Sequence, residues 1–164
     1  MLIHRLLQDG ANRHPDRPAW VWTDRGTTLS YSQAAETVER ASGALAGLGV
    51  KKGDRVGIFA HNGMDYLTAM FATFRLGAIA ALVNVKYAED LDYYLNDCKP
   101  KVLIYTGDHL STIEKHRSSL VDTETYVCFD GPQDRALSWS EIIENPNPAP
   151  ADTTSESDSA HLSY

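Results

Sequence analysis

The sequence has few cysteines and no long apolar run. Cys98 and Cys128 are its two cysteines, they lie far apart, and no Cys-x-x-Cys pair occurs. This scarcity argues against a disulfide scaffold and against a cysteine-ligated zinc site. No apolar stretch approaches the ~18 residues that a membrane span requires, and residues 1–13 lack the continuous apolar core of a signal peptide. These absences predict a protein of the reducing cytoplasm without a transmembrane segment.

Positive charge is also scarce. The 15 Lys and Arg residues are outnumbered by 22 Asp and Glu residues, so the net charge is −7 at pH 7. Because nucleic-acid binding needs clustered Lys and Arg, this balance argues against a nucleic-acid partner. Near the end of the chain, Asp152, Glu156 and Asp158 alternate with Ser and Thr, a composition that predicts a solvated linker. A length of 164 residues suits one domain with a buried core.

The central part of the sequence predicts a strand, a buried helix and a second strand. Val56–Phe59 is a short apolar run between the turn signals Gly53-Asp54 and Asn62-Gly63, as expected for a strand buried on both faces. Asn62 is expected to cap the next helix, Gly77 to end it, and Ala78–Val83 to form the second strand. Such a unit belongs to a parallel sheet. The predicted fold class is therefore α/β, a mainly parallel sheet flanked by helices.

Elements are also predicted before this unit. An amphipathic helix opens the chain and ends by Pro15, and residues 19–29 carry the signals of a hairpin. The Ser-x-x-Gln spacing of Ser30 and Gln33 predicts a capping box. Apolar residues then recur at helical spacing up to Gly47, which predicts the clearest amphipathic helix of the chain.

Downstream of the unit the pattern continues. Helices are expected near residues 91–98 and 108–120, and strands at residues 102–105 and 125–129. Ser138 and Glu141 repeat the capping-box spacing before a short helix. Residues 145–159 are expected to form an extended Pro/Ser/Asp-rich linker, and residues 160–164 the start of a last strand.

Four segments together resemble the amino-terminal part of the adenylate-forming (AMP-binding) superfamily, which includes acyl-CoA synthetases. Leu29–Gln33 is similar to the motif Leu-Thr-Tyr-x-Glu-Leu, and Gly53–Val56 with His61-Asn62 is similar to Gly-Asp-Arg-Val…Pro-Asn-Ser. Phe74–Asn84 resembles Lys-Ala-Gly-Ala-x-x-x-Pro-x-Asn, and Tyr93–Ile104 resembles the helix and strand ending in Ala-Lys-Val-Leu-Ile. The order and spacing of the four make the resemblance specific. Departures, such as His61 in place of proline, fall at positions with no chemical role in the family.

The resemblance also implies an incomplete enzyme. Ala160–Tyr164 is similar to the strand that leads into the family's glycine-rich phosphate-binding loop, and that loop is not among the 164 residues. Residues 1–144 would then be the N-terminal α/β part of an AMP-binding domain, a partial subdomain of an adenylate-forming enzyme. The expectation is an amino-terminal fragment that is inactive alone and that self-associates or aggregates through its open strand edges.

For the whole protein, the resemblance implies an ATP-dependent acid–thiol ligase of the acyl-CoA synthetase type. Such an enzyme uses ATP and Mg²⁺ to activate a carboxylic acid, here expected to be a fatty acid, as an acyl-adenylate, and transfers the acyl group to coenzyme A. The acid, ATP and coenzyme A would bind through the missing part, and none is expected on this piece. Two alternatives stay open: the adenylation domain of a peptide synthetase, and a noncatalytic α/β binding or interaction module.

Among the individual candidate residues, none is assigned a catalytic, cofactor-binding or metal-binding role. His61 is the most suggestive, because it follows a buried strand where open α/β sheets bind ligands, yet a structural loop histidine is the favoured interpretation. The other histidines show no metal-ligand spacing and are expected at the surface; they are His4, His14, His109, His116 and His161. No Ser/His/Asp arrangement indicates a nucleophile.

Three further patterns have structural explanations. The glycines of residues 47–53 lack the spacing of a dinucleotide loop and predict a helix end and turn. Glu89, Asp90 and Asp92 are expected at a helix start, where negative charge is favoured. The apolar side chains of the central helix that could line an acyl pocket are expected to form core instead; they are Met64, Leu67, Phe71 and Phe74.

Overall fold

The fold is built on a six-stranded, entirely parallel sheet. The computed structural model describes residues 2–164, and the strand order is β7-β6-β5-β3-β4-β8. The strands are β3 (Arg55–Phe59), β4 (Ile79–Leu82), β5 (Val102–Tyr105), β6 (Thr125–Cys128), β7 (Leu137–Ser138) and β8 (His161–Ser163). The α/β class and the mainly parallel sheet expected from the sequence are therefore confirmed.

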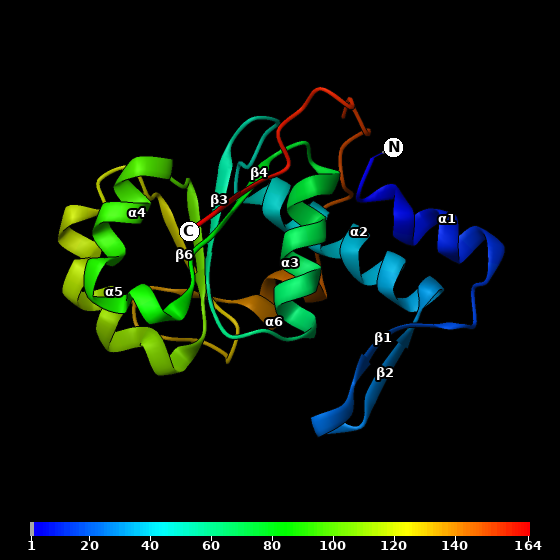
Figure 1. The fold of residues 1–164 in the computed structure, drawn as a ribbon, viewed down its shortest axis with the longest axis horizontal. Coiled ribbons are helices and arrows are strands. Elements are labelled where there is room, and N and C mark those ends of the chain that lie inside the picture. Colours follow the sequence, from blue (N-terminus) through cyan, green and yellow to red (C-terminus); the bar gives the residue numbers. More distant parts are fainter. Residues whose placement is uncertain (1) are drawn as a thin grey trace.

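Helices cover both faces of the sheet, because the chain runs in two directions from β3. The helices α2 (Tyr31–Gly47), α3 (Met64–Arg75) and α6 (Trp139–Glu144) pack together on one face. The other face is covered by α4 (Leu91–Cys98) and α5 (Leu110–His116). Figure 1 shows these two groups of helices on opposite sides of the sheet, and each encloses its own apolar core. The arrangement is that of a doubly wound α/β fold.

The predicted strand–helix–strand unit is confirmed. Val56 pairs with Ala80 and Ile58 with Leu82 in a parallel register. The predicted cap is wrong: Gly63, in an extended conformation, occupies the N-cap position of α3, and no side chain caps this helix. Asn62 precedes it and lines a surface cleft instead.

The amino-terminal elements pack on the outside of α2. The helix α1 (Arg5–Arg13) contacts α2. The strands β1 (Pro18–Trp22) and β2 (Thr27–Ser30) form a hairpin, and α2 begins directly after β2. Between these strands η1 (Thr23–Arg25) forms a short 3₁₀ turn. The predicted capping box is present: Gln33 N donates to Ser30 Oγ, and Ser30 N donates to Gln33 Oε1. The second predicted box does not form, because Ser138 Oγ contacts Ser140 Oγ and does not cap α6.

Residues 145–160 are irregular and none of them is buried, and two of their acidic side chains form specific contacts. Asp152 accepts hydrogen bonds from the Arg5 side chain, and Asp158 forms an ion pair with Lys52 at 2.6 Å. Arg40 donates to the carbonyls of Ile143 and Glu144, where this segment begins. Asp152 and Asp158 therefore hold the segment that precedes β8 against α1 and against the turn that follows α2. Within residues 2–164, no helix combines the length and apolar character needed to cross a membrane.

Candidate functional site

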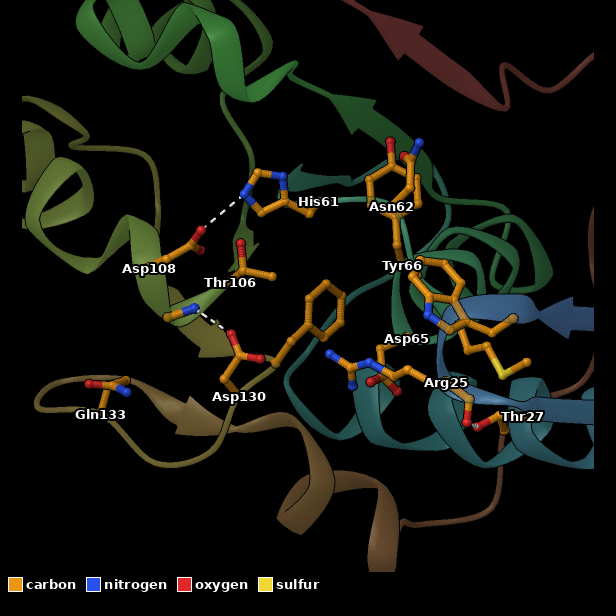
Figure 2. Close-up of a pocket in the computed structure, with 15 residues that line it drawn as sticks. Arg25, Thr27, His61, Asn62, Asp65, Tyr66, Thr106, Asp108, Asp130 and Gln133 are labelled. Atoms are coloured by element: carbon orange, nitrogen blue, oxygen red, sulfur yellow. Dashed lines mark hydrogen bonds and ion pairs between the residues drawn. The ribbon is translucent and has the colours of Figure 1, made fainter.

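A cleft of about 710 Å³ is present at the carboxyl edge of the sheet. It lies where β3, β5 and β6 end, and the hairpin between β1 and β2 closes its far side. Figure 2 shows polar side chains converging on this space from all four segments. Its lining residues include Arg25, His61, Asp65, Thr106, Asp108 and Asp130.

The cleft follows from the topology. From β3 the chain passes through α3 on one face to β4, and then returns through α4 on the other face to β5. The loops after β3 and β5 therefore leave the sheet toward opposite faces and open a crevice between them. Open α/β sheets bind their ligands at such a point.

One wall of the cleft carries a partly desolvated carboxylate. The indole Nε1 of Trp139, a fully buried residue of α6, donates to Asp65 Oδ1 at 3.2 Å. Although Asp65 keeps contact with solvent, the surrounding walls desolvate its carboxylate and raise its pKa, an effect that the Trp139 hydrogen bond opposes. Arg25 extends into the cleft beside it (Figure 2) and also opposes the rise.

A second carboxylate fixes the opposite wall. Asp130 Oδ2 accepts from the backbone N–H of Gly107 at 2.6 Å. Gly107 opens the short 3₁₀ segment η3 (Gly107–His109) that follows β5. This bond ties the loop after β6 to the loop after β5, so the cleft has a preorganised rim.

Two histidines and an aspartate gather at that rim. His61 Nε2 lies 2.9 Å from Asp108 Oδ2, and His109 Nε2 lies 3.9 Å from Asp108 Oδ1. Burial alone would raise the pKa of Asp108, but the Thr106 hydroxyl and the two imidazoles lower it. Desolvation lowers the pKa of His109, and Asp108 counteracts part of that effect. The ligand atoms of the three residues lie within 4.8 Å of one another.

A smaller cavity of about 320 Å³ lies on the same edge, where β3, β4 and β8 end. Tyr66, Asn84 and Tyr164 are among the residues that line it. The Tyr164 hydroxyl donates to Asp97 Oδ2 at 2.6 Å; burial and this acceptor both raise its pKa.

The histidines are distributed differently from the sequence expectation. His14 and His161 are exposed as expected, but His4 and His116 are buried. Each buried ring faces a carboxylate: His4 Nε2 lies 3.1 Å from Asp152, and His116 Nδ1 lies 3.2 Å from Asp92. The surface prediction is wrong for these two because such pairing makes burial of an imidazole tolerable.

The remaining candidates, except Met64, which was expected in the core, have the structural roles expected of them. Gly49 and Gly53 have φ of +84°, the left-handed conformation of a helix end and turn. Glu89 forms an ion pair with Lys115, and Asp92 faces His116, so both contact α5 and not each other. Phe74 is buried, Leu67 and Phe71 are partly buried, and Met64 lines the cleft.

Sequence reasoning missed Asp108 and His109. They lie close to His61 because β3 pairs with β5. In the sequence, Asp108 is 47 positions away from His61. A usable signal exists: both segments directly follow buried strands, and carboxyl ends of neighbouring parallel strands meet at one edge. Among residues 2–164, no serine or cysteine side chain is hydrogen-bonded to a histidine ring.

A polar cleft at the carboxyl edge of a doubly wound parallel sheet lies where open α/β folds bind their ligands. The family model described as AMP-binding enzyme matches residues 7–164. The chain belongs to this family.

Relatives and solved structures agree with that assignment. The chain is 34% identical over 145 residues to indoleacetate–CoA ligase of Aromatoleum aromaticum, covering 88% of this chain and 28% of the ligase. It is 33% identical over 112 residues to long-chain-fatty-acid–CoA ligase of Salmonella typhimurium, covering 67% and 20%. The chain thus spans less than a third of the length of either relative.

Two solved structures share the fold. A Mycobacterium tuberculosis fatty acyl CoA synthetase superposes with a TM-score of 0.89 at 23% identity, over 99% of this chain and 32% of that one. The anthranilate CoA ligase AuaEII, solved in complex with anthranoyl-AMP, superposes with a TM-score of 0.84 at 28% identity, over 96% and 30%.

Proposed function

We propose that this chain is the amino-terminal part of an ATP-dependent acid–CoA ligase. The family match over residues 7–164 carries the proposal. The whole protein would convert a carboxylic acid and ATP into an acyl-adenylate and pyrophosphate. Attack by the coenzyme A thiol on the acyl carbon would then release AMP and the acyl-CoA. A fatty acid is our preferred substrate, supported by relatives whose names specify medium- or long-chain acids.

The first step brings two anions together, so it needs cationic and N–H groups to offset charge in the transition state, and Mg²⁺ would supply part of that offset. Within this chain, the carboxyl edge of the sheet is the side that faces such a site, because β8 runs parallel to β4 and ends there. We assign residues 1–144 to the structural support of the site, and residues 145–159 and 160–164 to the connection and the strand that approach it. Both cysteines are buried and free, which suits a cytoplasmic location.

The 164-residue chain by itself is proposed to be inactive. The cleft is lined by carboxylates such as Asp65 and Asp130, which repel a triphosphate, with Arg25 as the one Lys or Arg among its lining residues. A glycine-rich loop would be the natural holder of the phosphates, since its N–H groups approach them closely. No such loop is among these residues.

The test uses the polypeptide translated from the whole gene. Release of AMP is measured with ATP, Mg²⁺ and coenzyme A across a series of straight-chain and aromatic carboxylic acids. The proposal expects AMP release that requires both a carboxylic acid and coenzyme A, with fatty acids preferred. Adenylate formation without transfer to coenzyme A would instead favour the adenylation domain of a peptide synthetase. Absence of acid-dependent AMP release with every acid would refute ligase activity.

A further inference from the structure

We propose that His61, Asp108 and His109 form a binding site for a divalent transition-metal ion, with Zn²⁺ as the expected ion. The site lies at the rim of the cleft and joins the loop after β3 to the 3₁₀ segment after β5. It is independent of the proposed ligase activity, because none of the three residues is assigned a part in that reaction.

The donor geometry supports the site. One carboxylate stands between two imidazoles: its Oδ2 is 2.9 Å from His61 Nε2, and its Oδ1 is 3.9 Å from His109 Nε2. Bonds of about 2.0–2.2 Å in a tetrahedral zinc site place the donor atoms roughly 3.3–3.6 Å apart. All three donors lie within 4.8 Å of one another. Because the His61 and Asp108 side chains are each 57% exposed, small rotations can close the remaining distance.

A second observation is an unsatisfied nitrogen. His109 Nε2 is buried and has no hydrogen-bond partner among the described residues. A buried polar atom without a partner carries a desolvation cost, and such atoms require an explanation. A metal ion between His109 and Asp108 would supply the missing partner.

The surroundings hold the ligands in place. The His109 ring packs on Phe59, a fully buried residue of β3, with ring centroids 4.8 Å apart. The bond from Gly107 N to Asp130 fixes the turn that carries Asp108 and His109 (Figure 2). Ligands that are positioned by packing and by neighbouring hydrogen bonds are typical of metal sites.

The chemistry of the donors selects the class of ion. Two imidazole nitrogens and one carboxylate oxygen suit Zn²⁺ and similar first-row divalent ions, whereas Mg²⁺ and Ca²⁺ prefer sites made of oxygen alone. Three protein ligands leave a fourth position open, and the exposed side of His61 faces solvent at the cleft. Water or an anionic group of a small molecule could occupy that position.

The test is titration of the 164-residue chain with ZnCl₂ by calorimetry, with Co²⁺ absorption as a second probe of the coordination. The informative variants are His61→Ala and Asp108→Asn, because both side chains are exposed and neither contributes to the core. His14→Ala is the matched control, since His14 is exposed and lies outside the cleft. Far-UV circular dichroism and thermal unfolding confirm that each variant is folded.

We expect one Zn²⁺ per chain, the visible bands of four- or five-coordinate Co²⁺, and a rise of the unfolding temperature with Zn²⁺. Each informative variant should bind Zn²⁺ at least about tenfold more weakly, and the control should bind as the parent does. The proposal is overturned if the folded parent binds no Zn²⁺. Unchanged affinity in both informative variants, or an equal loss in the control, would also overturn it.

Discussion

The imidazole of His4 lies 3.1 Å from the carboxylate of Asp152, although 148 residues separate them in the sequence. The same carboxylate accepts hydrogen bonds from Arg5 and Thr154. Burial would raise the pKa of Asp152, but its bonds with Thr154, Arg5 and His4 lower it far below the ordinary value. The first helix and the irregular segment before β8 are thus joined by one charged contact.

Asp152→Asn is expected to destabilise the chain by about 1–2 kcal/mol at pH 7, because it removes charge-assisted hydrogen bonds from a partly buried site. Since the pKa of Asp152 is lowered in the folded chain, its stabilisation is complete above the unfolded value of about 3.9. It is lost as the pH falls through the lowered folded value. Urea unfolding at pH 7, 5 and 3 measures the difference between parent and variant.

That difference should be equal at pH 7 and 5 and smaller at pH 3. Asp16→Asn is the control, because Asp16 is exposed and has no ion pair in the described part of the chain. A difference that stays constant down to pH 3 would contradict the ionic role of Asp152.

Gly43→Ala is expected to destabilise the chain, although alanine favours helices over glycine by about 1 kcal/mol. A Cβ on Gly43 would overlap the backbone carbonyl oxygen of Asn147, so α2 and the segment that crosses it would have to separate. Overpacking of this kind costs about 1–3 kcal/mol. In Gly47→Ala, the matched variant, the nearest contact is an ordinary 3.4 Å from the Asn147 side chain. Thermal unfolding that shows Gly43→Ala as stable as Gly47→Ala would refute this packing.

Ser30→Ala should lower the free energy of unfolding by about 1 kcal/mol, the usual value of an N-cap hydroxyl. The serine hydroxyl accepts from Gln33 N, and its loss leaves that donor at the start of α2 without its partner. Ser32→Ala, one position beyond the first helical residue, should change stability by less than about 0.5 kcal/mol. Equal effects of the two substitutions in urea unfolding would show that the capping box contributes nothing.

Self-association is expected through β8, which lies at the edge of the sheet with all three residues exposed. Leu162 adds an exposed apolar side chain to this edge. An open edge with apolar side chains favours pairing with another chain, and a lysine discourages it. Light scattering during gel filtration should show a mass that rises with concentration, and Leu162→Lys should suppress the rise. A parent chain that remains monomeric at every concentration would refute the expectation.

Local patterns were sufficient for most elements of the fold. Short apolar runs bounded by turn residues located β3 and β4, and the Ser30–Gln33 spacing located the start of α2. The failures arose where the outcome depends on contacts distant in sequence. Asparagine is a favourable N-cap residue, yet the N-cap position of α3 is occupied by Gly63 and not by Asn62. The ion pairs of Asp152 and Asp158 were not predicted, because their basic partners Arg5 and Lys52 lie far away in the sequence.

The site was predictable only in part. His61 follows a buried strand and lies at the edge of the sheet that carries the candidate cleft, although a structural loop histidine was the favoured interpretation. Its partners Asp108 and His109 follow a different strand, and no spacing in the sequence relates them to His61. To predict that these residues lie close to His61, one must know that β3 pairs with β5 as well as with β4. Which strands are neighbours in a parallel sheet depends on the whole fold, and single sequence motifs do not specify it.

The most direct measurement of the central claim is acid-dependent exchange of labelled pyrophosphate into ATP, which reports adenylate formation alone. It is applied in parallel to the 164-residue chain and to the polypeptide translated from the whole gene. The account predicts exchange that requires a carboxylic acid in the whole polypeptide and none in the 164-residue chain. Exchange catalysed by the 164-residue chain alone, or its absence from the whole polypeptide with every acid offered, would contradict it.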